Sequence, residues 1–214
     1  MDDPSVGYKL INYYYYHNIM MQTIEIIGYK RANHKKQVTK QLRSEANVPG
    51  VLYGGESQIH FYTPVALLKQ LVYTPHPHFI DFNLEGTTYK CILQDVQYHP
   101  VSDMILHIDL MQIFDNKKIK MLIPTELVGS APGVTQGGKL VHKHKKLSVS
   151  AYPNYMPSKI EVDISTLEVG QMTRICHLKP AEYTILALPN TPIAAVETTR
   201  SLRAAEAAAT DSKK

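Results

Sequence analysis

Short segments rich in β-branched and aromatic residues, separated by glycines and prolines, run through most of this 214-residue chain. Such segments are typical of β-strands, and no long stretch has the 3.6-residue period of a helix. Two short helices are predicted between strands, at 39–46 and 64–72. The fold class is therefore expected to be mainly β. In the first half we expect strands at 22–29, 51–53, 58–63, 79–84, 88–98 and 105–113, with a hairpin turn at 85–87.

A second set of strand patterns begins after the polar segment 114–118. We place a domain boundary near residue 113, which predicts a first domain at 21–112 and a second, all-β domain at 113–199. A glycine-rich loop is expected at 129–138. The strands of this half are expected at 119–127, 139–152, 159–164, 172–177, 183–188 and 193–198.

The two ends of the chain lack these patterns. Residues 1–20 have acids where a secretory signal peptide has its basic region, and tyrosines interrupt any apolar core. The adjacent Met20 and Met21 offer an alternative start, so we expect 1–20 to be a spurious or disordered extension. Residues 200–214 are alanine-rich and polar, which predicts a flexible tail.

Composition excludes several classes of protein. With 44% hydrophobic and 20% charged residues, the chain can form a packed core. Cys91 and Cys176 lie far apart and outside any CxxC pattern, which argues against a disulfide framework and a structural zinc site. No stretch approaches the roughly 18 apolar residues needed to cross a bilayer. We expect a cytoplasmic protein without a membrane partner, cofactor or small-molecule substrate.

A local run of positive charge is the first candidate site. The run contains no acidic residue, although the net charge of the chain is only +4. Such a run can neutralise RNA phosphates, but a solvated polar loop has the same composition. The six basic residues are Lys30, Arg31, Lys35, Lys36, Lys40 and Arg43.

Polar residues in the expected strands form the second candidate site. His107 and Asp109 are spaced i, i+2 between apolar neighbours, so both project from one face. Asp109 can accept hydrogen bonds from a base edge, and Gln94 can both donate and accept. Tyr53 lies beside glycines that permit close backbone approach, and its ring can stack on a base. A solvent-facing sheet without a ligand has the same alternation.

These features occur together in one known family. Arg31 and the segments 39–43, 48–54, 94–100 and 106–109 closely resemble large-subunit ribosomal protein twenty-five, the Ctc family. The segments 137–140, 160–164 and 167–170 resemble the extra β domain of its long, two-domain members. Gln41 and Tyr98 depart from the pattern, because basic residues are common there.

The resemblance implies a fold, a partner and a set of contact residues. The first domain is expected to be a small β-barrel that binds 5S rRNA in the large ribosomal subunit. The protein would then be a ribosome-associated structural constituent, possessing no catalytic residues. We also expect Lys36, in the basic run, to contact phosphate. The RNA-contacting positions implied by the resemblance are Arg31, Lys40, Arg43, Tyr53, Gln94, His107 and Asp109.

Other functions are compatible with parts of the pattern. His99 and His107, with nearby aspartates, could supply acid and base to a ribonuclease, but no nucleophile, phosphate-loop or metal motif accompanies them. Small β-barrels also serve many functions, so another RNA such as tRNA is an alternative ligand. Residues 113–199 could act in protein interaction alone. His142 and His144 have spacing suited to a metal, but the neighbouring lysines favour a basic strand surface facing rRNA.

Overall fold

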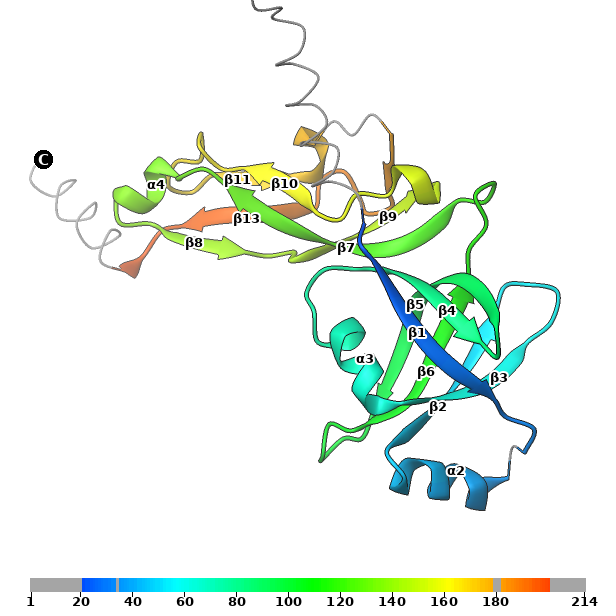
Figure 1. Cartoon of the computed structure of the whole chain (residues 1–214). Coiled ribbons are helices and arrows are strands. Elements are labelled where there is room, and N and C mark those ends of the chain that lie inside the picture. Colours follow the sequence, from blue (N-terminus) through cyan, green and yellow to red (C-terminus); the bar gives the residue numbers. More distant parts are fainter. Residues whose placement is uncertain (1–20, 34, 179–181, 201–214) are drawn as a thin grey trace, which may run out of the picture. The chain divides into compact units, whose positions relative to one another are not determined.

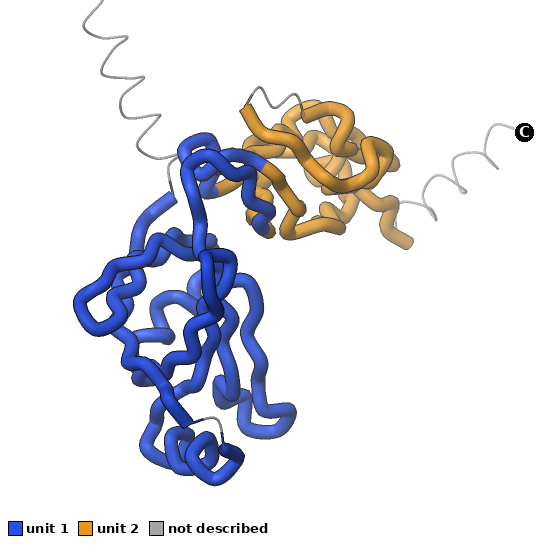
Figure 2. The backbone as a smooth tube through the Cα atoms, turned by 90° about the vertical axis from the view of Figure 1, so that its right-hand side faces the viewer, with its two compact units in different colours: residues 1–121, 151–158 blue, residues 122–150, 159–214 orange. Residues whose placement is uncertain are grey.

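The computed structural model describes residues 21–33, 35–178 and 182–200. The predicted extension at 1–20, and the predicted tail beyond Arg200, lie outside the described residues. Contacts within the chain define two compact units, coloured separately in Figure 2. The first unit contains residues up to 121 and Ala151–Ser158, and the second contains Leu122–Ser150 and the chain from Lys159. The predicted domain boundary near residue 113 stays a prediction.

The first unit is built around a closed barrel with strand order β1-β3-β2-β6-β5-β4, so that β4 pairs again with β1 (Figure 1). Its β2–β6 and β1–β4 pairs are parallel, and the other pairs are antiparallel. Closure leaves no free sheet edge. The elements are β1 (Thr23–Lys30), α2 (Lys36–Ser44), β2 (Asn47–Tyr53), β3 (Ile59–Pro64), α3 (Val65–Val72), β4 (Phe79–Leu84), β5 (Thr87–Tyr98) and β6 (Ile105–Gln112).

Alternating apolar residues of the barrel strands fill its interior. The rings of Phe61 and Phe82 are 4.5 Å apart between centroids, and Leu68 of α3 is fully buried in the same cluster. Only glycine fits at position 50 in this packing, because a Cβ there would lie 2.8 Å from the carbonyl oxygen of Ile108. The barrel therefore has a largely apolar core; the hydroxyl of Thr63, which is also fully buried, donates to the carbonyl oxygen of Ile27 at 2.8 Å.

The expected hairpin turn is confirmed. Leu84 of β4 pairs with Thr87 of β5, which leaves Glu85 and Gly86 as a two-residue turn. Both have positive φ, 51° and 93°, as a type I′ turn requires. Asn83 stabilises the turn, because its Oδ1 accepts a hydrogen bond from the Gly86 N–H at 3.1 Å.

The predicted helix at 64–72 is confirmed as α3, but the one at 39–46 begins earlier. Helix α2 starts at Lys36 and ends at Ser44. Residue Lys35 occupies the N-cap without a side-chain hydrogen bond to the helix, so the usual sequence signal for a helix start is absent. Lys36 is therefore the first residue of a helix rather than part of a loop.

The second unit contains two small sheets with orders β10-β7-β9-β12 and β11-β13-β8. Strand β13 lies between β11 and β8, and its residues Ile193–Val196 are all buried. The fold class is thus confirmed as mainly β in both units. The elements after β6 are β7 (Ile119–Val128), α4 (Pro132–Thr135), β8 (Lys139–His142), β9 (Lys146–Ala151), η1 (Pro153–Tyr155), β10 (Ile160–Asp163), β11 (Met172–Arg174), η2 (Ile175–His177), β12 (Thr184–Ile185) and β13 (Pro192–Glu197).

The expected continuous strand at 139–152 is wrong. The chain pairs with β13 as β8, leaves strand geometry at 143–145, and continues as β9 in the other sheet. The Thr125 hydroxyl stabilises this crossing, because it donates to the carbonyl oxygen of His144 at 2.8 Å. Strands at 172–177 and 183–188 are also shorter than expected, and the loop at 129–138 contains the helical turn α4.

Within the part of the chain that the structure describes, no helix is long and apolar enough to span a bilayer.

Candidate nucleic-acid interface

The outer face of β6 carries the polar pair expected from the sequence. Ile108 and Leu110 are fully buried in the barrel core. Because successive side chains of a strand point to opposite faces, His107 and Asp109 lie on the outer face. Their side chains are 29% and 31% exposed. The strand is apolar toward the core and polar toward solvent, as its alternation predicts.

Strand pairing connects Asp109 to residues far away in the sequence. Its partner on β5 is Asp95, and its partner on β2 is Val51, which lies opposite His60 of β3. The backbone N–H of Arg31, directly after β1, donates to the carbonyl oxygen of His60 at 2.9 Å. Paired residues share a face of the sheet. These residues therefore form a first row across the outer face: Asp95, Asp109, Val51, His60 and Arg31.

A second row lies two residues further along the same strands. Gln97 is opposite His107, and Pro49 is opposite Tyr62, whose partner on β1 is Tyr29. Ile108 is aligned with Gly50, so His107 and Pro49 take the neighbouring position in that parallel pair. The second row is Gln97, His107, Pro49, Tyr62 and Tyr29.

His107 and Asp109 also contact one another. The Nδ1 atom of His107 lies 2.7 Å from Oδ1 of Asp109, although the ring nitrogen has no aligned hydrogen-bond acceptor. The contact holds both groups on the outer face. A carboxylate has about four lone-pair positions, so Asp109 keeps room for donors from a ligand.

Tyr53 ends β2 beside these carboxylates. Burial, followed by the negative charges of Asp109 and Asp95, raises the pKa of the Tyr53 phenol. The phenol therefore keeps its proton, and remains a hydrogen-bond donor, to a higher pH than an ordinary tyrosine. Gly54 follows with φ of 97°, which turns the chain sharply away from the strand end.

Gln94 reaches the same region through a β-bulge. The register of β5 against β6 shifts between Leu93 and Asp95, so Gln94 is an extra residue with no partner on β6. Bulges of this kind redirect side chains at the edge of a pairing. Gln94 and Asp95 are consecutive exposed residues beside Asp109, and no feature of the sequence predicts this bulge.

Helix α2 carries the basic residues to the end of the polar face. Lys36, Lys40 and Arg43 follow one another at spacings of four and three residues, so they lie along one side of the helix. Nε and Nη2 of Arg43 donate to the carbonyl oxygen of Leu106 at 3.1 and 2.9 Å. Because Leu106 immediately precedes His107, Arg43 fixes α2 next to the second row. Arg43 thus anchors the helix as well as carrying charge.

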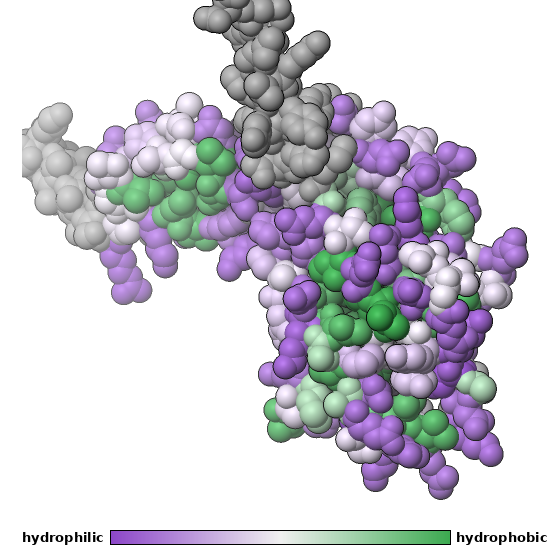
Figure 3. Space-filling model, viewed as in Figure 1, coloured by the Kyte–Doolittle hydropathy of each residue, from purple (hydrophilic) through white to green (hydrophobic). Residues whose placement is uncertain are grey.

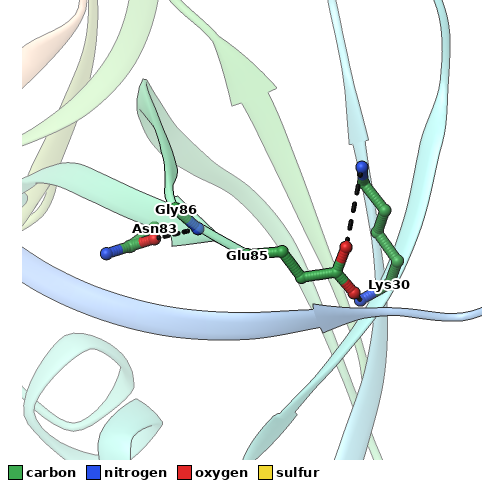
Figure 4. A network of polar contacts seen from close by, with 4 residues as sticks. All are labelled: Lys30, Asn83, Glu85 and Gly86. Carbon is green, nitrogen blue, oxygen red and sulfur yellow. Dashed lines mark hydrogen bonds and ion pairs between the residues drawn. The ribbon is translucent and has the colours of Figure 1, made fainter.

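One cation of the basic run is paired with a carboxylate. The backbone N–H of Lys30 donates to Oε1 of Glu85 at 3.2 Å, and its Nζ lies 3.7 Å from Oε2 of the same carboxylate (Figure 4). Glu85 is held there by the hairpin turn that follows β4. Lys30 therefore differs from Lys36 and Lys40, whose residues are exposed on the helix.

The space-filling view shows one face of the barrel unit. Hydrophilic residues cover much of its sides and of the end where α2 lies in Figure 3, and a hydrophobic area is visible over the barrel near β1. Ile27 of β1 is 51% exposed.

Several residues of the two rows were missed by sequence reasoning. They are brought beside the expected ones by long-range strand pairing, and no local sequence signal identifies them. The partners gained in this way, outside the segments that carry the family resemblance, are Tyr29, His60 and Tyr62.

The histidines of the second unit have structural partners. Nε2 of His142 lies 2.7 Å from the Thr125 hydroxyl, and Nδ1 of His144 lies 2.7 Å from the carbonyl oxygen of Pro192. Burial lowers the pKa of His142. The spacing that suits a metal on a strand is lost because β8 ends at His142. Over the described ranges, no group of three or more His, Cys, Asp or Glu side chains could hold a metal ion.

Comparison with known proteins identifies the class. The family described as Ribosomal L25p family matches residues 26–110, and the one described as Ribosomal protein TL5, C-terminal domain, matches residues 118–200. The large ribosomal subunit protein bL25 of Amoebophilus asiaticus is 67% identical over 189 residues, covering 88% of this chain and 96% of that protein. The bL25 proteins of Cytophaga hutchinsonii and Bacteroides fragilis are 46% and 38% identical, covering 88% of this chain and 98% and 99% of those proteins.

The barrel, its polar face and these matches define a structural, non-enzymatic ribosomal protein with two β units. The chain belongs to the bL25 family of large-ribosomal-subunit proteins, in its long, two-domain form. Membership of this family confirms the resemblance drawn from the sequence motifs, and it excludes the ribonuclease alternative.

Proposed function

We propose that this chain binds 5S rRNA through the outer face of the barrel and thereby forms part of the large ribosomal subunit. The observation that carries the proposal is the convergence of Tyr53, His107 and Asp109 from two strands, with Gln94 presented beside them by a bulge. These groups supply a ring, an imidazole, a carboxylate and an amide, all of which can contact base edges or ribose.

Helix α2 would supply the contacts that do not depend on base sequence. Lys36 and Lys40 are exposed on one side of a helix that Arg43 fixes beside His107. Contacts from such cations to phosphates position a protein on RNA, whereas contacts to base edges specify the sequence. The face and the helix are adjacent, so one RNA segment could engage both.

The test is a filter-binding comparison of the full chain with 5S rRNA, tRNA and an unrelated hairpin at several salt concentrations. We expect 5S rRNA to bind more tightly than the other two RNAs at each salt concentration. Preferred binding of tRNA would favour the alternative ligand. Co-sedimentation with the large subunit at near-stoichiometric amounts would support the assembly role independently, and equal affinity for all three RNAs would contradict specific recognition.

A further inference from the structure

Tyr29 and Tyr62 form an aromatic pair on the outer face of the barrel. They are opposite one another on β1 and β3, with ring centroids 5.4 Å apart and an angle of 28° between the ring planes. Tyr62 thus covers one part of the Tyr29 ring. Tyr29 remains 46% exposed despite this contact. Aromatic surface is therefore left open to a planar ligand.

This pair lies in the same row as His107. The second row runs from His107 through Pro49 to Tyr62 and Tyr29. Neighbouring strands are about 4.8 Å apart, so β3 is about 10 Å from β6 along the face. A nucleic acid that touches His107 therefore needs only a few nucleotides to reach the tyrosines.

The charge next to the pair suits a polyanion. Arg31 follows two residues after Tyr29 and is fixed by its backbone hydrogen bond to His60. The carboxylate of Glu85, close to the end of β1, is engaged by Lys30. A phosphate approaching Arg31 would bring its own base or the next one toward Tyr29.

We propose that the Tyr29–Tyr62 pair is a stacking platform for an unpaired base of the bound RNA, at the far end of the face from Asp95. The proposal rests on the proposed RNA-binding function and extends its footprint to β1 and β3. Stacking of a base on an exposed ring does not depend on base identity, because every base has a π-face. The platform would add affinity and fix the RNA path without reading sequence.

A simpler role for the pair is to stabilise the barrel. Aromatic residues opposite one another on neighbouring strands stabilise a sheet whether or not a ligand binds. The two roles differ in what they predict, because a purely structural pair affects melting and leaves RNA affinity unchanged.

The experiment compares full-length wild type with Tyr29→Phe and Tyr29→Ile for binding to 5S rRNA, with thermal melts alongside. Isoleucine, like tyrosine, has a high preference for strands, but it lacks the ring. We expect Tyr29→Phe to bind like wild type and Tyr29→Ile to bind about 5- to 150-fold more weakly. The matched control is Tyr155→Ile, which removes a tyrosine that is 53% exposed in a short turn outside the barrel strands and should leave affinity unchanged.

Tyr29→Trp gives a second readout that does not depend on the stability of Tyr29→Ile. The chain contains no tryptophan, so this variant has a single indole reporter. Stacking on a base should quench its emission when 5S rRNA is added, and we expect quenching that saturates with the binding curve. If wild type binds 5S rRNA but Tyr29→Ile binds equally well and the indole is not quenched, the platform is wrong and the proposed function stands. If wild type does not bind 5S rRNA, both are wrong.

Discussion

The carboxylate of Asp109 lies 2.7 Å from the imidazole of His107, two residues earlier on the same strand. Directly across the sheet from Asp109 is a second carboxylate, Asp95 of β5. Two acids opposite one another are unfavourable. A ligand that donates hydrogen bonds to Asp109 would offset this unfavourable pairing.

The pair Asp95 and Asp109 allows a matched test of base recognition. Asp109→Asn replaces one acceptor oxygen by an NH2 group, so a donor of the RNA would face a donor of the protein. We expect affinity for 5S rRNA to fall by about 5- to 150-fold, because a good base contact contributes about 1–3 kcal/mol. Filter binding should show little change with an unrelated hairpin. Asp95→Asn removes a negative charge from the same face and should leave binding equal or slightly tighter. Equal losses in both variants would contradict a specific role for Asp109.

The basic helix predicts a salt dependence that distinguishes its exposed lysines from Lys30, which contacts Glu85. Lys40→Ala should weaken binding to all RNAs and reduce the log–log salt slope by about one unit, because one phosphate contact and its released counterion are lost. Lys36→Ala should behave in the same way. Lys30→Ala is the control, since Lys30 is paired with Glu85. The prediction is wrong if Lys30→Ala and Lys40→Ala change the slope equally.

Arg43 donates two hydrogen bonds to the carbonyl oxygen of Leu106. A lysine at this position would keep the positive charge but should not anchor helix α2 equally well. Lysine cannot form both bonds in the same geometry, because it lacks the planar fork. We expect Arg43→Lys to lower the free energy of unfolding by about 0.5–1.5 kcal/mol. It should also weaken 5S rRNA binding, because α2 is no longer fixed beside His107. Chemical denaturation and filter binding of the same samples would measure both effects, with Lys36→Arg as the charge-conserving control. Unchanged unfolding would show that Arg43 does not anchor the helix.

The two cysteines should differ in reactivity. Burial raises the pKa of the Cys91 thiol to about 12, whereas Cys176 is exposed. Native protein at pH 8 should therefore react with one equivalent of an alkylating reagent, at Cys176, and denatured protein with two. Above pH 9 the unfolded Cys91 thiol ionises while the folded one does not. This contribution to stability should be present below pH 9 and be lost as pH rises toward 12. Peptide mapping of the labelled cysteine checks the assignment, and rapid native labelling of Cys91 would contradict it.

The barrel predicts that the first domain is self-sufficient. All of its strands lie between Thr23 and Gln112, and its core cluster lies between Ile26 and Leu110. A fragment of residues 21–112 should fold by circular dichroism and bind 5S rRNA with affinity close to that of the full chain. A folded fragment without a gel shift would show that the second unit takes part in recognition.

What the sequence determined about this protein is local. The period of two along β6 places His107 and Asp109 on one face, because that alternation depends only on the strand itself. The turn at Glu85 and Gly86 and the apolar side of α3 follow in the same way from nearby residues. The family motifs then linked these segments to a known fold and to the large ribosomal subunit.

The tertiary structure decided which of these segments meet. Lys36 lies in a helix whose start has no capping residue, and Arg43 bonds to Leu106, which is 63 positions away. The contact between Lys30 and Glu85 spans 55 positions. The two rows depend on the register of strands that are distant in the chain, and local patterns do not encode that register. It is set by closure of the barrel around a common core, and only this closure brings Tyr29 and Arg31 onto the face that carries Asp109.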